Sequence, residues 1–457
     1  MNTKKIIFIL VFLTVAFFSF SQAYDALNFS LTDPVAGTAR YTGMAGAMGA
    51  LGGDATAMKD NPAGMGIYRR SDITMNYTVG YASGDNLATP NRFINNFAFV
   101  LNLGNSDNEK GYITSSLGVS YNRLKNFKRY SELTTLNNPV SVTDVIPDVD
   151  YYFYKTPRDF ELETVNTSIK YTEKGKIGEW NISYGLNISN IVYLGTSVGF
   201  VNLNYKQFAL YEEQERWKNI NGYWCLDNTY EVSGKGLNFK FGIIVAPIDF
   251  IRVGLAYHMP TLYENMDEYV LKRVNRELFY ISNVSYFDIQ TPSKWQGSLG
   301  FIIGKRAIVG LEYQLEDFSA IKTYYDGALD QVSKNYINSE MNITHTIKAG
   351  GEVKIIDGVS FRAGLAFVSN PSTKLPESVY SAPESFQVYP LVQPQNRFYY
   401  TGGIGYRGES FYLEMAYMHQ TRKEYLFEYL PKKTGPYDVT LRSNNIILAI
   451  GFRFSTD

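Results

Sequence analysis

Short segments of the chain alternate strictly between apolar and polar positions. In the first of them one face is apolar and the other polar or small, with Ile73, Met75, Tyr77, Val79 and Tyr81 opposite Thr74, Asn76, Thr78 and Gly80. Strands that cross a bilayer show this pattern because every second side chain meets lipid while the others face the lumen. The segment therefore predicts a transmembrane β-strand.

Thirteen further segments have the length that a tilted membrane strand requires, about 9 to 11 residues or somewhat more. They cover residues 94–103, 111–122, 178–188, 192–206, 232–245, 250–260, 291–302, 306–316, 342–354, 359–367, 398–406, 410–420 and 441–454. With the first segment, starting at residue 72, they make fourteen. We predict an all-β fold in which residues 72–457 form a 14-stranded antiparallel transmembrane β-barrel.

The connections between these segments alternate in length. Those with odd numbers run from 12 to 55 residues, whereas those with even numbers run from 3 to 7. Outer-membrane barrels have long extracellular loops and short periplasmic turns, so the alternation supports the assignment independently. The longest connection, residues 123–177, is rich in Tyr and is predicted to be an extracellular loop.

The segment before the first strand has a different character. Residues 36–66 contain eight Gly and eight Ala, too little apolar bulk for a free domain. We predict that residues 24–71 form a hatch inside the barrel lumen. Within it, Asp54 is a good N-cap for a helical turn over 55–58, and the run Asn61-Pro62-Ala63-Gly64 is predicted to end that helix.

The chain opens with an export signal. Lys4 and Lys5 precede an apolar run, and Ser21-Gln22-Ala23 has the small-x-small form of a cleavage site. Residues 1–23 are therefore predicted to be a signal peptide, with a transmembrane anchor as the less favoured alternative. Aromatic residues make up 15% of the chain, yet mean hydropathy is only −0.19. This combination is typical of outer-membrane barrels with aromatic girdles, and we expect localisation to the bacterial outer membrane.

Charge and cysteine content exclude several classes of protein. Without the two signal lysines, 41 basic residues oppose 44 acidic ones, a balance of −3, so we expect no nucleic-acid partner. The single Cys225 cannot form an intramolecular disulfide. The three histidines belong to separate segments, and the sequence contains no HExxH or Walker motif. We predict a protein that is not an enzyme and that needs no cofactor or metal.

Several stretches resemble the FadL family of outer-membrane transporters for long-chain fatty acids and other hydrophobic compounds. They are Thr38–Met44, Asn61–Gly64, TPSKWQGSLGF, VGLEYQLEDFSA, IKAGGEVKIIDGVSFRAGLAF and YYTGGIGYRGESFYLEMAY. The resemblance implies a fourteen-stranded barrel with an N-terminal hatch, capture of ligand near the outer mouth and passage into the bilayer through a gap in the wall. It also implies that Asn61, Pro62, Ala63 and Gly64 belong to a gate, whereas a simple turn is the alternative from the residues.

Other candidate site residues come from position in the strands. Gly118 lies within a strand, where Gly weakens pairing, and is a candidate for a lateral opening, with an ordinary small lumenal residue as the alternative. Arg397, His258 and Lys348 face the lumen by alternation and are candidates for binding a ligand carboxylate. Pairing of such charges with lumenal carboxylates, for which Glu352 and Glu414 are available, is the competing expectation.

The expected partners are a hydrophobic small molecule and outer-membrane lipid, and nothing in the sequence requires more than a monomer. The sequence does not choose between a fatty acid, an aromatic hydrocarbon and another lipid. A second function remains open, because FadL-like barrels are also similar to an accessory, cargo-binding component of a protein-secretion system. A stable complex in native membranes would favour that role.

Overall fold

The computed structural model describes residues 25–455 with several gaps, which are residues 85–86, 107–109, 139–161, 218–219, 275–276, 284–285, 305, 373–390 and 428–436. The predicted signal peptide, residues 1–23, and its cleavage site lie outside the described residues. The last described residue of the final strand is Phe454.

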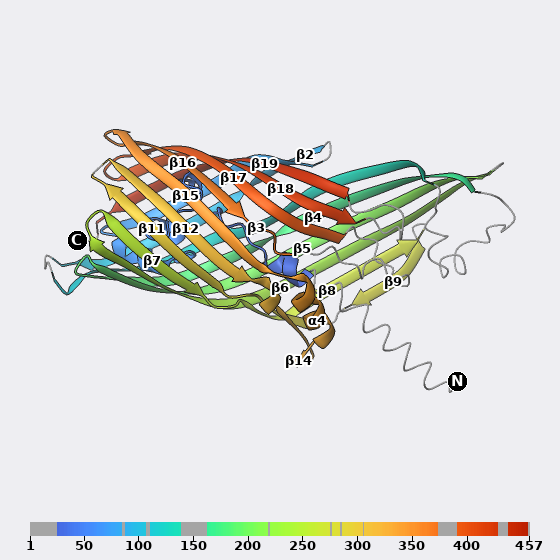
Figure 1. The fold of residues 1–457 in the computed structure, drawn as a ribbon, viewed down its shortest axis with the longest axis horizontal. Helices are drawn as coiled ribbons and strands as arrows, with labels where there is room; N and C mark the ends of the chain where they lie inside the picture. The colour runs from blue at the N-terminus through green and yellow to red at the C-terminus, as the bar shows by residue number, and fades with distance from the viewer. Residues whose placement is uncertain are drawn as a thin grey trace.

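Fourteen antiparallel strands close into a ring (Figure 1). In wall order they are β1 (Ser71–Gly84), β2 (Leu87–Asn105), β3 (Tyr112–Asn138), β4 (Leu162–Ile188), β5 (Val192–Trp217), β6 (Ile220–Ile248), β7 (Ile251–His258), β11 (Lys294–Ile303), β12 (Ala307–Asp317), β15 (Ile343–Ile356), β16 (Val359–Val368), β17 (Leu391–Arg407), β18 (Phe411–Phe427) and β19 (Tyr437–Phe454). The ring closes where β1 pairs with β19, from Ser71 opposite Phe454 to Ser83 opposite Arg442. The predicted fourteen-stranded antiparallel barrel is confirmed.

Side chains alternate across this wall as the sequence pattern predicts. On β1, Met75 and Tyr77 are about two-fifths exposed on the outside, whereas Thr74 and Asn76 are buried inside. The exposed apolar positions continue around the ring and include Ile182, Leu255, Leu365 and Leu448, with others on the remaining strands. Such a continuous apolar belt has no counterpart on an ordinary soluble protein. Among the helices of the described residues, none has the length and hydrophobicity to cross a bilayer.

One side of the barrel is much taller than the other. Strands β3 to β6 project far beyond the rest of the wall at one end, which we call the long-loop end (Figure 1). The opposite, short-turn end carries the tight turns and the end of β19. The prediction that 123–177 is a loop is wrong for its described part, because β3 continues to Asn138 and β4 begins at Leu162. These extensions pair with each other from Lys125 to Asn138, and outside the bilayer a strand does not need apolar alternation.

Small elements cover part of the long-loop end. They are the strands β8 (Leu262–Val274), β9 (Glu277–Asn283), β10 (Phe287–Gln290), β13 (Lys322–Tyr325) and β14 (Ala328–Leu329), the short helix η4 (Phe318–Ala320) and the helix α4 (Gln331–Glu340). β8 pairs with the projecting half of β6, and β10 pairs with both β8 and β13. These elements extend the wall upward rather than adding strands to the ring.

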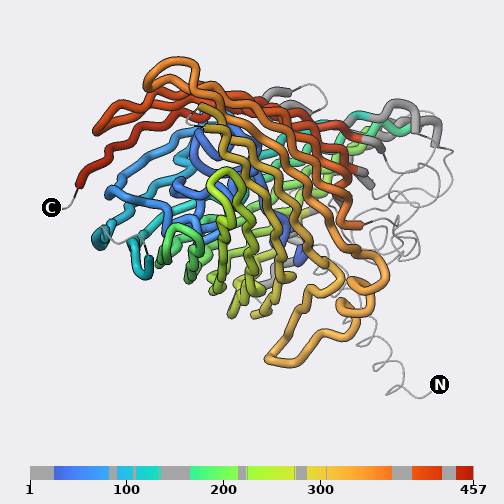
Figure 2. Tube along the Cα trace, turned by 60° about the vertical axis from the view of Figure 1, so that its left-hand side comes forward, coloured from blue at the N-terminus to red at the C-terminus, as the bar shows by residue number. Residues whose placement is uncertain are grey.

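Residues 31–70, which we call the inner segment, lie within the ring of strands (Figure 2). The segment contains α2 (Ala39–Gly43), η1 (Ala55–Met58) and η2 (Pro62–Ile67). The predicted turn after Asp54 is confirmed, since its carboxylate caps η1 at the amide of Thr56. The run that starts at Asn61 has a different role from the predicted one. The side chain of Asn61 caps the start of η2, and Pro62 occupies its first turn, where a missing N–H costs nothing.

The inner segment lies directly on glycines of the wall. Backbone atoms of the segment occupy the space that a Cβ would need at Gly195, Gly310, Gly350 and Gly364. Register places Gly310, Gly350 and Gly364 side by side on β12, β15 and β16. A row of residues without side chains therefore lets one backbone pack against another.

Ion pairs also hold the inner segment to β15, one of the strands that carry these glycines. Arg40 makes two hydrogen bonds to Glu352, at 2.8 and 3.1 Å. Glu352 also accepts a bond from Arg362, which in turn reaches Glu414 at 3.0 Å. Because every charged group in this series of ion pairs has a partner, the groups can be buried without the cost of an isolated ion.

Candidate functional site

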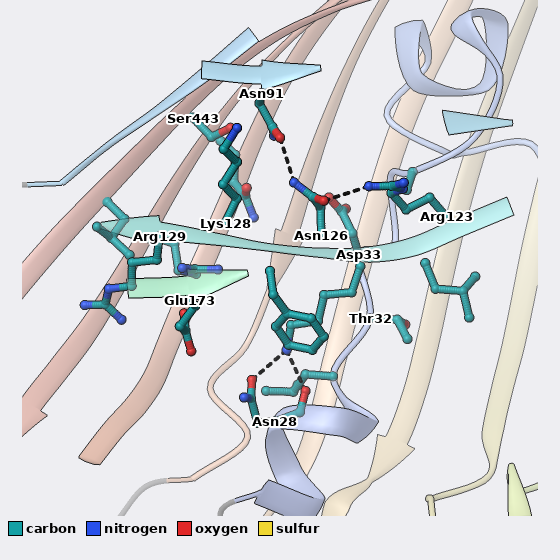
Figure 3. Close-up of a pocket in the computed structure, with 18 of the residues that line it drawn as sticks. Asn28, Thr32, Asp33, Asn91, Arg123, Asn126, Lys128, Arg129, Glu173 and Ser443 are labelled. Carbon is teal, nitrogen blue, oxygen red and sulfur yellow. Dashed lines mark hydrogen bonds between the residues drawn. The ribbon is translucent and has the colours of Figure 1, made fainter. Parts of the chain in front are cut away.

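A cavity of about 240 Å³ lies in the long-loop half of the lumen. Its walls are the extensions of β3, β4 and β5 on one side and β17, β18 and β19 on the other, with residues 25–36 beside it (Figure 3). The inner segment lies between this cavity and the short-turn end.

Part of the cavity wall is apolar. The residues of this part come from five strands and from residues 25–31, and are Leu27, Leu31, Phe93, Phe127, Tyr205, Met418 and Ile447. Phe127 and Tyr205 stand edge to face, with ring centroids 4.8 Å apart. Aromatic and aliphatic side chains of this kind take an apolar ligand out of water at about 25 cal/mol per Å².

The rest of the wall is strongly basic. Seven lining residues are basic, namely Arg123, Lys125, Lys128, Arg129, Arg397, Arg422 and Arg442, whereas four are acidic, namely Asp25, Asp33, Glu173 and Glu424. An excess of positive charge beside apolar surface suits a ligand with an anionic head and an apolar body.

Arg129 has hydrogen-bond donors that are not used within the protein. One of its nitrogens donates to Glu424 at 2.7 Å, but Nε and Nη2 have no partner. Only 4% of its side chain is exposed, so water does not satisfy these donors freely. Buried unpaired donors are costly, and an anion in the cavity would supply the missing acceptors.

Strands β2 and β3 separate at the edge of this cavity. Their backbone pairing runs from Asn105 opposite Thr114 to Asn96 opposite Asn122. Beyond that point, in the described residues 90–95 and 123–131, β2 pairs with β1 and β3 pairs with β4, but not with each other. Only side chains cross the space, where Asn126 donates to Asn91 at 2.6 Å (Figure 3).

The separation starts at the upper rim of the apolar belt. Tyr121, the neighbour of Asn122, packs on Trp180 of β4, and Trp180 is half exposed on the outside. Trp and Tyr on the outer surface of a barrel are typical of the membrane interface. The space between β2 and β3 therefore opens at the height of the lipid headgroups.

Solved structures share the fold of this barrel. A monoaromatic hydrocarbon channel, CymD, matches with TM-score 0.55 and 11% identity over 93% of this chain and 98% of its own. A FadL homologue of Pseudomonas aeruginosa matches with TM-score 0.54 and 14% identity over 93% and 98% of the two chains. The toluene transporter TodX of P. putida matches with TM-score 0.54 and 11% identity over 93% and 100%.

The chain has the FadL-type barrel fold. The resemblance noted from sequence phrases is thus confirmed at the level of the fold. No family model matches the chain, and no curated protein does. At these identities the solved structures show the fold alone, so the residues of this chain must carry the argument about function.

In this FadL-type barrel the three candidate carboxylate contacts do not come together. Arg397 lines the cavity and donates to the backbone oxygen of Thr32 at 3.1 Å. His258 donates from Nε2 to the backbone oxygen of Asp60, 2.6 Å away, beside a smaller cavity. Lys348 is fully buried against Glu312 at 2.8 Å, as the alternative of charge pairing expects, although with a different carboxylate.

The smaller cavity, of about 80 Å³, is lined mostly by polar and charged groups. Lys240 pairs with Glu179 and Lys294 with Glu316 on its walls. The inner segment contributes Lys59. Burial of this side chain lowers its pKa to about 8. An apolar ligand would bind poorly in such an ionic cavity, because it would displace the water that solvates the charged groups.

Gly118 lies within the paired part of β3. Val100 of β2 and Ser183 of β4 stand opposite it, so the backbone pairing is continuous there and ends above it. On its inner side a Cβ would meet Met58 and Met65 of the inner segment, each at 2.6 Å. The missing side chain at Gly118 therefore lets Met58 and Met65 pack directly against β3.

The gate candidates lie against the wall on the same side. The side chain of Asn61 donates to the backbone oxygen of Gly49 at 2.8 Å and accepts from the amide of Ala63. Pro62 and Ala63 cover Gly195, and Gly64 touches Gly52. These contacts tie η2 both to the wall and to the rest of the inner segment.

Sequence reasoning missed the basic residues of β3. Four of the seven residues from Arg123 to Arg129 are basic, a density that stands out in a nearly neutral chain. The sequence pattern predicts a loop for this run and therefore gives no direction for its side chains. A search for clustered charge at the ends of predicted strands would have found it.

Proposed function

We propose that the protein is a passive transporter of the bacterial outer membrane for hydrophobic compounds, with long-chain fatty acids as the first candidates. The observation that carries the proposal is a cavity that combines apolar and basic walls and borders a break in strand pairing at lipid height. A carboxylate would lie among the basic residues, while the acyl chain would gain about 0.8 kcal/mol for each methylene that leaves water.

In this proposal the ligand leaves the cavity laterally, through the wall of the barrel. The inner segment acts as the hatch between the cavity and the short-turn end, and the ionic cavity at the long-loop ends of β7, β11 and β12 disfavours an acyl chain on that side. The space between β2 and β3 leads instead to the outer leaflet, where the ligand keeps its apolar surroundings. We place the lateral opening above Gly118, between Asn91 and Asn126. Rearrangement of η2, from Asn61 to Gly64, accompanies passage.

A cross-link across the opening tests this route. In a Cys225→Ser background, Asn91→Cys with Asn126→Cys would let a reducible thiol cross-linker join β2 to β3, because the two side chains are in hydrogen-bond contact. Uptake of radiolabelled oleate by cells should fall when the link forms and return on reduction. Full uptake in the linked protein would refute lateral release.

A second linked pair provides the control. Gln420 and Ser443 stand opposite each other on β18 and β19 and line the same cavity. A link between Gln420→Cys and Ser443→Cys joins strands that are already paired, so it closes no opening. Equal loss of uptake in both linked proteins would point to a general effect of the reagent.

A role as an accessory component of a secretion system is the second candidate. The observation in its favour is the tall sheet of β3 to β6, which projects beyond the barrel and offers a surface for a partner (Figure 1). Affinity purification from native membranes separates the two functions. A stoichiometric protein complex favours the accessory role, whereas co-purified lipid in the cavity favours transport.

A further inference from the structure

Residues 25–31 fill an apolar recess next to the cavity. Phe29 is 1% exposed, and its ring meets the edges or faces of Phe127 and Tyr205 at centroid distances of 6.3 and 5.4 Å. Leu27 and Leu31 are buried in the same cluster. An aromatic ring from the chain itself thus occupies a pocket built from aromatic rings.

Two oxygens of the same segment engage a lysine of the cavity. The ammonium group of Lys125 donates to the backbone oxygen of Asn28 at 2.5 Å and to its side-chain oxygen at 2.8 Å (Figure 3). Two oxygens on one cation is the arrangement that a carboxylate offers. Asn28 and Phe29 together therefore present a ring next to a pair of oxygens.

We propose that this recess is a binding site for aryl carboxylates, and that residues 25–31 occupy it as an internal competitor which the ligand displaces. The ring of the ligand takes the place of Phe29 between Phe127 and Tyr205. Its carboxylate takes the place of the two Asn28 oxygens at Lys125. The inference rests on the proposed function, because it names a ligand class for the same cavity.

Ring recognition follows from the geometry of the recess. The Phe29 ring lies at interplanar angles of 90° to Phe127 and 68° to Tyr205, so it makes edge-to-face contacts with both. A ligand ring in that place keeps these contacts, whereas a linear alkyl chain has no ring quadrupole to use. The site therefore favours a ring over a chain of similar size.

Carboxylate recognition follows from exchange of a neutral partner for a charged one. At Lys125 the Asn28 oxygens are dipoles, whereas a carboxylate carries a full charge and makes the stronger hydrogen bonds. Arg397 and Arg422 line the same cavity and add to the positive field. An amide of the same shape would gain much less.

Displacement is feasible because residues 25–31 are held mainly by side chains. Besides the bonds from Lys125, the hydroxyl of Tyr230 donates to Asp25 at 2.7 Å. The neighbouring cavity, about 240 Å³, gives the segment room, and it is smaller than the roughly 300–1,000 Å³ typical of ligand pockets. Removal of the segment from the recess is what enlarges it.

Binding of 4-phenylbutyrate to the mature protein in lipid nanodiscs tests the inference by equilibrium dialysis. A competitor lowers the apparent affinity by the fraction of sites that it occupies, so Phe29→Ala should tighten binding about tenfold. Phe318→Ala is the control, since Phe318 is a buried aromatic residue of the same cluster that belongs to η4. It should not tighten binding. Unchanged affinity in Phe29→Ala would overturn the inference.

The carboxylate part has its own readout. The wild-type protein should prefer 4-phenylbutyrate over 4-phenylbutyramide, and Lys125→Gln should abolish that preference. A purely structural role for Lys125 would weaken both probes equally, which would overturn this part of the inference.

Displacement of residues 25–31 can also be followed by fluorescence. In Phe29→Trp the indole should move from the recess into water when 4-phenylbutyrate binds, with a red shift of its emission. Binding without a shift would show that the segment stays in place and would overturn the inference. Oleate binding keeps the two proposals distinguishable. Oleate binding without any effect at residue 29 leaves transport standing, whereas binding of neither probe refutes the proposed function itself.

Discussion

Pro62 of the inner segment lies directly on Gly195 of β5, where its carbonyl group occupies the space of the missing side chain. Gly195 stands between Gly185 and Gly242 in the register of β4, β5 and β6. Three strands thus present bare backbone at the same height. The fit explains how a segment with little apolar bulk is held inside the lumen.

The first prediction is that Gly195→Val displaces η2 from the barrel wall. The new side chain must push Pro62 and Ala63 away, and overpacking of this kind typically costs about 1–3 kcal/mol. We expect faster hydrogen exchange of the amides in residues 61–67, with the strands of the barrel unaffected. Gly297→Val is the control, because a Cβ at Gly297 finds Leu255 only at 4.0 Å. Equal hydrogen exchange in both variants would show that η2 does not depend on its packing against Gly195.

The second prediction concerns the ion pair between Arg40 and Glu352. Arg40→Met removes two hydrogen bonds to a charged group, each worth about 1.5–3 kcal/mol, although Glu352 keeps Arg362 as a partner. We expect the inner segment to dock less firmly while the barrel still folds. Protease accessibility of residues 36–66 in intact outer-membrane vesicles measures this.

Lys206→Met is the control for this experiment. Lys206 pairs with Glu231 on the projecting sheet, and about half of its side chain is exposed, so its loss should have almost no effect. If Arg40→Met is as resistant to protease as Lys206→Met, the ion pair does not anchor the segment.

The third prediction concerns the unpaired donors of Arg129. Arg129→Met should weaken binding of oleate about tenfold or more, because the loss of a charged hydrogen-bond partner costs roughly 1.5–3 kcal/mol. Glu424 is left with Arg422 at 2.6 Å, so no isolated charge remains. Affinity for oleyl alcohol, which has no charge, should change little. An equal loss for the acid and the alcohol would contradict an anion site at Arg129.

The strands of the wall could be predicted from sequence, and the reason is physical. Lipid imposes a period of two on every membrane strand, so Met75 and Thr74 report their directions without any knowledge of the fold. Above the bilayer no such constraint exists. The stretch from Arg123 to Asn138 therefore looked like a loop although it is strand.

The site was predicted less well for a related reason. Alternation gives the direction of a side chain but not its depth in the lumen. Arg397, His258 and Lys348 all point inward, yet they lie beside the large cavity, beside the small cavity and in a buried ion pair respectively. The role of Phe29 was not accessible either, since its partners Phe127 and Tyr205 come from distant strands.

The last prediction is a pH dependence that originates at Lys125. Burial lowers the pKa of Lys125 to about 7, and nearby Arg422 and Arg397 add to this, whereas Glu173 and Glu424 oppose it. The ammonium form therefore predominates below pH 7 and is lost as the pH rises through that value. A fatty acid is ionised throughout this range, so its attraction to Lys125 disappears at higher pH. Affinity for oleate should fall about three- to tenfold between pH 6 and pH 8, since one pKa unit corresponds to 1.36 kcal/mol. Binding of oleyl alcohol should not change with pH, and Lys125→Gln should remove the pH dependence for oleate. A pH profile that persists in Lys125→Gln would assign the titration to another group and refute this role of Lys125.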